Sequence, residues 1–209
     1  METLETFRDE LCRNIDESLN LIQTVNSIIS QPSLPVNLSI EQRDFIFEWA
    51  FVKVHAAWET FLENCFLTYM LGGHTASGFA PVRYVFPNNE QHALDIILAG
   101  RDYFRWTDPS IVKKQSNLCF QNGEPFGEGL DLAMEDLQEM NTVRNAVVHR
   151  SRAALERFKS LVRGKLLTAP LDITPGKFLI TTKPGTVRRT YFGHYCNKLK
   201  VIANKIVPS

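Results

Sequence analysis

Residues 45–62 have the sequence FIFEWAFVKVHAAWETFL, and this stretch decides the fold. Large apolar side chains occupy most directions around a helical wheel of the segment, as in a helix that other helices surround. Ser39 and Gln42 have the spacing of a capping box before it, and the Gly-Gly pair at 72–73 is a helix stop behind it. The sequence therefore predicts a central, mostly buried helix over residues 40–70, with its tryptophans and phenylalanines in the core.

Periodic apolar residues predict more helices on both sides of this one. An amphipathic helix is expected over residues 3–30, ending before two closely spaced prolines. Polar caps predict shorter helices after Asn88 or Asn89, at Asp108–Pro109, and after Ser151. The expected core helices of this all-α bundle cover about residues 3–30, 40–70, 128–149, 152–163 and 187–206.

A proline- and glycine-rich segment interrupts the helical pattern near residues 166–186. Within it, Lys177–Thr182 is rich in β-branched and aromatic residues, which favour strands. We therefore expect one or two short strands there, as a β-hairpin or arm attached to the bundle. The length of 209 residues suits one domain covering residues 1–209.

Composition limits the classes of protein to which the chain can belong. No apolar run approaches the roughly 20 residues that span a bilayer. The segment of residues 1–5 contains two glutamates and no basic residue, whereas a signal peptide begins with basic residues. We therefore expect a cytoplasmic protein with no membrane partner. The four cysteines lie 53, 54 and 77 positions apart, without metal-ligand spacing, and are expected to be reduced and mostly buried.

Charge is distributed unevenly, although the net charge is zero. Residues 144–209 contain 14 of the 23 basic residues and two acidic ones, a net charge of +12, which leaves −12 for residues 1–143. Such asymmetry indicates a polyanionic partner or an acidic-to-basic contact within an oligomer. An equally good interpretation is that the two segments neutralise each other on one folded surface.

The side chains best suited to catalysis lie in the segment EMNTVRNAVVHR, residues 139–150. On a helix, Asn145 lies about 100° and His149 about 140° from Arg144, while Val143 and Val147 lie near 260° and 300°. One side of the helix is therefore polar and the other apolar. Histidine is the residue type best suited to proton transfer near neutral pH, which His149 supplies. The guanidinium of Arg144 suits a phosphate, and Asn145 can orient either one. This set needs no metal and no cofactor to cleave a phosphodiester.

The pattern Arg-Asn-x-x-x-His near the end of a late helix resembles the R-x4-6-H signature of the HEPN superfamily. Residues 51–62 are similar to the aromatic-Glu second helix of its prokaryotic members, notably the RiboL-PSP type. The resemblance covers about residues 45–70 and 128–165. It implies a bundle of four or five helices and a homodimer whose two motifs form one composite site. It also implies a metal-independent endoribonuclease that acts as a toxin or in defence against phages and plasmids, with an antitoxin or regulatory protein as a further partner.

Carried onto this chain, the resemblance makes Arg144 the phosphate-stabilising residue, Asn145 the positioning residue and His149 the proton-transfer residue. Arg150 and Arg152 are the expected RNA-binding residues next to them, although a solvated helix face explains such a basic run equally simply. Glu59 is a candidate for orienting Arg144. The other glutamate to consider is Glu48, whereas His55 is expected to be a core histidine.

Structural explanations compete with the functional ones. Arg144 is able to pair with Glu139 or another acid, and His149 is able to satisfy a carbonyl at the end of its helix. A second functional hypothesis is a non-catalytic HEPN module that binds RNA, a nucleotide or a partner protein. A third is an antitoxin-like or scaffold subunit that assembles through its apolar helices.

Overall fold

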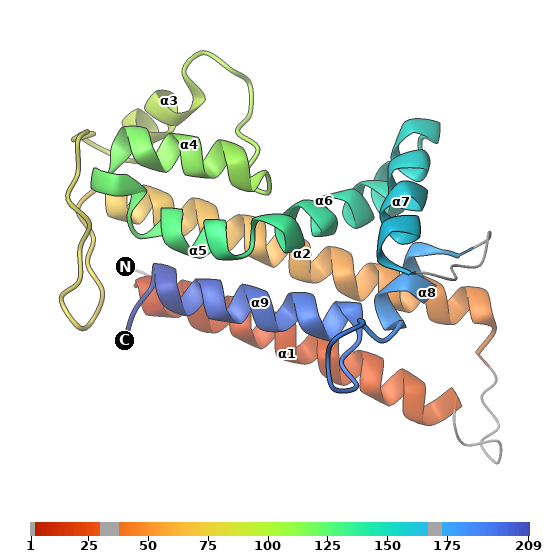
Figure 1. The fold of residues 1–209 in the computed structure, drawn as a ribbon. Coiled ribbons are helices and arrows are strands. Elements are labelled where there is room, and N and C mark those ends of the chain that lie inside the picture. The colour runs from red at the N-terminus through yellow and green to blue at the C-terminus, as the bar shows by residue number, and fades with distance from the viewer. Residues whose placement is uncertain (1–2, 30–37, 167–172) are drawn as a thin grey trace. The chain divides into compact units, whose positions relative to one another are not determined.

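The computed structural model describes residues 3–29, 38–166 and 173–209, and these residues form helices joined by loops (Figure 1). The all-α prediction is confirmed: the described ranges contain no regular strand, only isolated β-bridges at Arg83–Phe120 and Thr182–Thr190. The helices are α1 (Leu4–Ile29), α2 (Ile40–Met70), α3 (Glu90–Leu98), α4 (Pro109–Cys119), η1 (Gln121–Gly123), α5 (Phe126–Leu132), α6 (Met134–His149), α7 (Arg152–Lys165), α8 (Pro175–Ile180) and α9 (Tyr191–Ile206).

The chain divides into two compact units, each assembled from separate stretches. The first unit comprises Met1–Cys12, Ala57–Gln138 and Lys198–Ser209, and the second comprises Arg13–Ala56 and Glu139–Asn197. Each of the long helices α1, α2, α6 and α9 contributes residues to both units. The expectation of a single domain over the whole chain stays a prediction.

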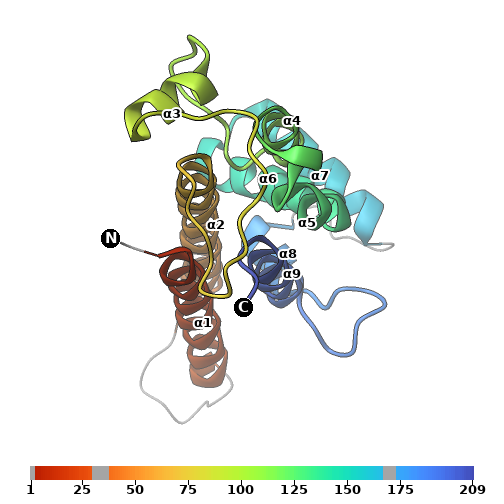
Figure 2. The same ribbon diagram turned by 90° about the vertical axis from the view of Figure 1, so that its left-hand side faces the viewer.

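An aromatic cluster forms the core of the first unit. The Phe66 ring lies 5.5 Å from Trp106, 5.1 Å from Phe120 and 4.9 Å from Phe126, measured between ring centroids. The nearby Tyr69 hydroxyl donates a hydrogen bond of 2.7 Å to the carbonyl of Ile206 in α9. Figure 2 shows α5 close to α4 in this unit. Rings that interlock in this way bury large apolar areas and fix the helices of the unit against one another.

The second unit contains the C-terminal part of α1, the N-terminal part of α2, most of α6, all of α7 and α8, and the N-terminal part of α9. An ion pair of 2.6 Å between Lys53 and Glu17 joins α2 to α1 on the exposed side. The core includes Phe178 stacked on Tyr191 with centroids 4.3 Å apart, and Phe51 lying 6.3 Å from Tyr195. All the residues of the predicted site except Glu59 belong to this unit.

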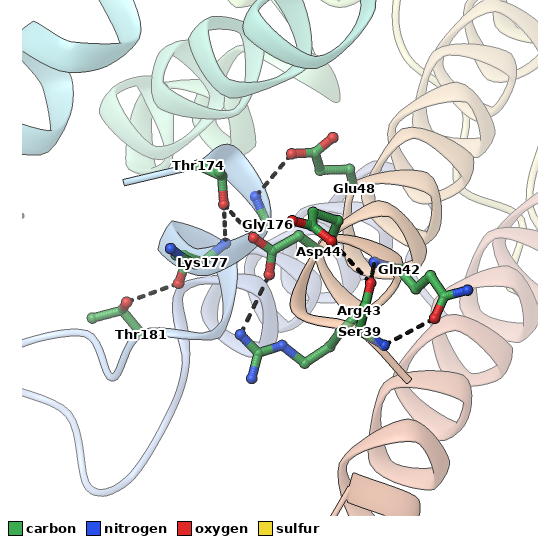
Figure 3. A network of polar contacts seen from close by, with 10 residues as sticks. Ser39, Gln42, Arg43, Asp44, Glu48, Thr174, Gly176, Lys177 and Thr181 are labelled. Atoms are coloured by element: carbon green, nitrogen blue, oxygen red, sulfur yellow. Dashed lines mark hydrogen bonds and ion pairs between the residues drawn. The ribbon is translucent and has the colours of Figure 1, made fainter. Parts of the chain in front are cut away.

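The prediction of a strand at residues 177–182 was wrong, because Pro175–Ile180 form the helix α8. Thr174 caps this helix by accepting a hydrogen bond from the backbone N–H of Lys177, and Pro175 has a φ angle already suited to its first turn. Figure 3 shows Thr174 and Gly176 facing the acidic side chains of α2. A cap and a docking surface therefore outweigh the strand propensity of these residues. Positions 167–172 of the expected arm lie outside the described residues.

Two helix boundaries also differ from expectation. The single helix predicted over residues 128–149 is two helices, α5 and α6, separated at Ala133, where the backbone leaves helical geometry (φ −126°, ψ 14°). The last helix begins at Tyr191 instead of residue 187, because residues 181–190 form a closed loop. The N–H of Lys183 donates to the carbonyl of Arg189, and the Thr182–Thr190 bridge joins the two ends.

The expectation that every large aromatic residue lies in the core was partly wrong. Trp58 is 1% exposed and Trp106 is 4% exposed, but Trp49 is 63% exposed and Phe45 is 62% exposed. The cysteine expectation holds: all four thiols are free, three are buried, and Cys12 is half-buried. None of the helices in the described ranges combines the length and apolarity that crossing a bilayer requires.

Candidate functional site

Helix α6 presents two faces, as the sequence predicts. Met140, Val143 and Ala146 are at most 1% exposed and hold the helix against the core. Val147, which the sequence placed on the same apolar face, is only half-buried. The helix ends at His149, and Arg150 follows in a left-handed conformation with φ of 45°. This sharp end leaves the side chain of His149 exposed in the last turn of the helix.

The three predicted site residues lie together on the polar face of α6. One guanidinium nitrogen of Arg144, Nη1, is 3.0 Å from Oδ1 of Asn145 and 3.1 Å from Nε2 of His149. Arg144 and Asn145 are half-buried. One cation, one amide and one imidazole therefore form a continuous cluster that a ligand can approach from solvent.

The contact between Arg144 and His149 restricts the part that the imidazole plays in it. A guanidinium nitrogen only donates hydrogen bonds, so Nε2 of His149 serves as the acceptor in this contact. In this arrangement His149 is ready to accept a proton at Nε2 once Arg144 releases that atom.

A buried histidine supports the cluster from α2. Nε2 of His55 is 2.9 Å from Oδ1 of Asn141, which lies one turn before Arg144 in α6. His55 is 3% exposed, and its burial lowers its pKa to about 4, while the hydrogen bond to Asn141 acts in the opposite direction and raises the pKa. The positive charge of Arg144 lowers the pKa of His55 further. His55 is therefore a neutral core histidine, as the sequence predicted, and it joins α2 to the part of α6 that carries the cluster.

Glu48 joins the other end of α6 to α2 and α8. Its carboxylate accepts a hydrogen bond of 3.2 Å from the N–H of Gly176 and lies 3.4 Å from the guanidinium of Arg150. The Glu48 side chain is buried, and desolvation raises its pKa, while the N–H of Gly176 and the charge of Arg150 act in the opposite direction. Glu48 thus holds one guanidinium nitrogen of Arg150, while the side chain of Arg150 remains 68% exposed.

A second acidic residue of α2 fixes the start of α8. The hydroxyl of Thr174 donates a hydrogen bond of 2.6 Å to Asp44, and Arg43 lies 3.4 Å from the other carboxylate oxygen (Figure 3). Asp44 and Glu48 are one turn apart, so the α8 N-terminus rests on two neighbouring carboxylates. These contacts place α8 beside the residues that follow His149 in the chain.

Glu139 is not the partner of Arg144. Its buried carboxylate forms an ion pair with Lys165 of α7 and accepts a hydrogen bond of 2.9 Å from the hydroxyl of Tyr195 in α9. Both oxygens of Glu139 are thus directed at other helices. The structural explanation that paired Arg144 with Glu139 is therefore wrong, and the guanidinium lies beside Asn145 and His149 instead.

The remaining predicted residues, Arg152 and Glu59, belong to helices other than α6. Arg152 is exposed in the first turn of α7, whose N-cap is Ser151 as the sequence predicts, so its contact with RNA stays a prediction. Glu59 is half-buried in the part of α2 that belongs to the first unit. Its charge contributes to raising the pKa of Glu63, after burial, which is the larger cause. The supporting role of Glu59 stays a prediction as well.

Asn141 was missed at the sequence level, although a signal for it existed. It lies four residues before Asn145 and therefore on the same helical face, which a wheel of residues 139–150 shows. Glu48 and Arg150 are 102 positions apart in the sequence, so no local pattern predicts their contact. Trp49 was assigned to the core because its neighbours in α2 are apolar.

Within residues 3–29, 38–166 and 173–209, no group of three or more His, Cys, Asp or Glu side chains is arranged to hold a metal ion. No family model, curated protein or solved structure matches the chain.

Proposed function

We propose that this protein is an endoribonuclease that cleaves RNA through attack by the 2′-hydroxyl, without a metal. The observation that carries the proposal is the contact of 3.1 Å between Arg144 and His149, which joins a fixed cation to an imidazole on an exposed helix end. The HEPN resemblance of the same residues supports it. The positive net charge of residues 144–209 supports a polyanionic substrate.

Each residue has a defined part in the proposed reaction. A scissile phosphate draws the guanidinium of Arg144 away from His149, because a charged acceptor forms the stronger hydrogen bond. Nε2 of His149 then accepts the proton of the 2′-hydroxyl while the 2′-oxygen attacks phosphorus. The bond from phosphorus to the 5′-oxygen breaks, and that oxygen takes up a proton. The products are a 2′,3′-cyclic phosphate and a 5′-hydroxyl.

Arg144 stabilises the charge that develops on the phosphoryl oxygens during this step. Asn145, which accepts a hydrogen bond from Arg144 in the free protein, keeps the guanidinium over the same helical face. Removal of one such charge-stabilising donor typically costs about 100- to 1000-fold in rate. We therefore assign Arg144 and His149 as catalytic residues and Asn145 as a positioning residue.

The test is cleavage of a single-stranded RNA in EDTA by the purified protein. His149→Ala and Arg144→Ala should each lower the rate at least about 100-fold with an unchanged circular dichroism spectrum. His74→Ala and Arg105→Ala are matched controls, because these residues are exposed in the first unit and should leave the rate unchanged. EDTA-resistant cleavage that persists in His149→Ala would contradict the mechanism.

The same experiment separates the second candidate function. The guanidinium occupies Nε2 of His149 in the free protein, and a ligand that leaves this contact intact would be bound without reaction. RNA or nucleotide binding without turnover in the wild-type protein would therefore identify a non-catalytic HEPN module.

We further propose that the enzyme acts as a homodimer and as a toxin or defence effector in the cytoplasm, restrained by an antitoxin or regulatory protein. The resemblance supports these roles, and the exposure of His149 leaves room for the motif of a second copy. Light scattering measures the oligomeric state. Induced expression should arrest growth with the wild-type gene and not with His149→Ala.

A further inference from the structure

Two large aromatic side chains of α2 are exposed one helical turn apart. Trp49 is 63% exposed and Phe45 is 62% exposed, whereas the other two tryptophans, Trp58 and Trp106, are buried. Neighbouring aromatic rings on an otherwise ordinary helix surface are typical of a binding surface, because water contact with them is unfavourable. We therefore expect a ligand to bind at these two rings.

The register of α2 and α6 places these rings beside the proposed active site. His55 contacts Asn141 of α6. Glu48, seven residues earlier in α2, contacts Arg150, which lies nine residues after Asn141 and directly follows the end of α6. The two helices therefore run antiparallel within the second unit. Trp49 follows Glu48, and His149 precedes Arg150, so the indole and the imidazole lie at the same level of the helix pair.

The surface around this level is cationic. Arg150 is exposed, and α7 begins two residues later with the exposed Arg152. Further along α7, Arg157, Lys159 and Arg163 are exposed, and Glu156 is the one acidic residue of that helix. A polyanion such as RNA complements the charge of such a surface.

We propose that Phe45 and Trp49 form a stacking surface for unpaired bases of single-stranded RNA, adjacent to His149. The inference rests on the proposed function and specifies its substrate: a strand whose bases are free to stack while its phosphates lie along the arginines. Stacking on an aromatic ring accepts any base but requires it to be unpaired. The site therefore selects single strands and loops with little sequence preference.

Binding is measured with a labelled single-stranded RNA in which every 2′-hydroxyl is methylated, so that it cannot be cleaved. Trp49→Ala and Phe45→Ala should each weaken binding roughly 5- to 150-fold, the effect of losing one base–aromatic stack. Trp49→Phe keeps an aromatic ring and should retain most of the affinity. Tyr103→Ala is the matched control, since Tyr103 is 69% exposed in the first unit, and it should bind as the wild type does.

Tryptophan fluorescence gives an independent measurement. Trp49 is the single exposed tryptophan of the three, so stacking of a base should quench its emission. Trp49→Phe should lose the quenching while it still binds the labelled RNA. A fully paired duplex of equal length should compete much more weakly than the single strand, because its bases are already stacked on one another.

The outcomes distinguish this inference from the proposed function. Wild-type affinity in both alanine variants, equal competition by the duplex, or a dimer that dissociates in Trp49→Ala without loss of RNA binding would each overturn the stacking surface. Cleavage that depends on His149 would still establish the nuclease in those cases. If Trp49→Ala and Phe45→Ala lose RNA binding but the wild type does not cleave RNA, the stacking surface is supported and the proposed catalysis is contradicted. In an active enzyme, Trp49→Ala should raise KM and leave kcat nearly unchanged.

Discussion

Substitution of His55 by glutamine should change how the stability of the protein depends on pH. The folded state holds His55 neutral, because burial lowers its pKa to about 4, while the unfolded chain has the ordinary value of 6.5. As pH falls below 6.5, the unfolded state binds a proton that the folded state does not, so the free energy of unfolding decreases. The loss continues until pH reaches the lowered pKa of His55, where the folded state also binds the proton.

The size of the effect follows from the difference between the two pKa values. A shift of one pKa unit corresponds to about 1.4 kcal/mol, so the full loss is about 3 kcal/mol, and about 2 kcal/mol of it appears between about pH 7.5 and about pH 5. Glutamine at position 55 is able to keep a hydrogen bond to Asn141 but does not titrate. The stability of His55→Gln relative to the wild type should therefore improve by these amounts as pH falls.

Urea denaturation at a series of pH values measures this difference directly. Other titrating groups, including Glu48, are present in both proteins and cancel in the comparison. His74→Gln is the control, because His74 is exposed and its replacement should leave the pH profile parallel to that of the wild type. If the wild-type and His55→Gln curves stay parallel from about pH 7.5 to about pH 5, then His55 is not a buried neutral histidine and the reasoning is refuted.

Three further substitutions test the packing around the site. Gly176→Ala would place a Cβ 2.7 Å from the backbone oxygen of Asp44, so thermal unfolding should show a loss of about 1–3 kcal/mol. Gly164→Ala, in open space on α7, should instead stabilise the protein by about 0.5–1 kcal/mol, and a loss there would contradict the helix assignment. The pKa of Glu48 is raised in the folded state, so ionisation of this carboxyl makes the free energy of unfolding decrease as pH rises. Glu48→Gln removes this contribution, and the free energy of unfolding measured with urea should therefore decrease less toward neutral pH than in the wild type. An unchanged decline would show that another carboxyl is responsible.

Local signals in the sequence predicted most helix starts, because a cap acts within a few residues of itself. The capping box of Ser39 and Gln42 is present, with Gln42 accepting from the N–H of Ser39 at 2.8 Å, and α2 has the predicted range. Asn89 and Asp108 cap α3 and α4 through their side chains. The same helical periodicity placed Arg144, Asn145 and His149 on one side of α6.

The tertiary structure alone decided the features that depend on contacts between distant residues. Residues 175–180 have a local cap in Thr174, and Asp44 and Glu48, about 130 positions away, hold the start of α8 in place through contacts that no local pattern indicates. Trp49 is exposed although its neighbours in α2 are buried, because helices cover only some faces of α2 at that level. Periodicity within one segment indicates where an apolar face lies, but it contains no information about which faces the other helices cover.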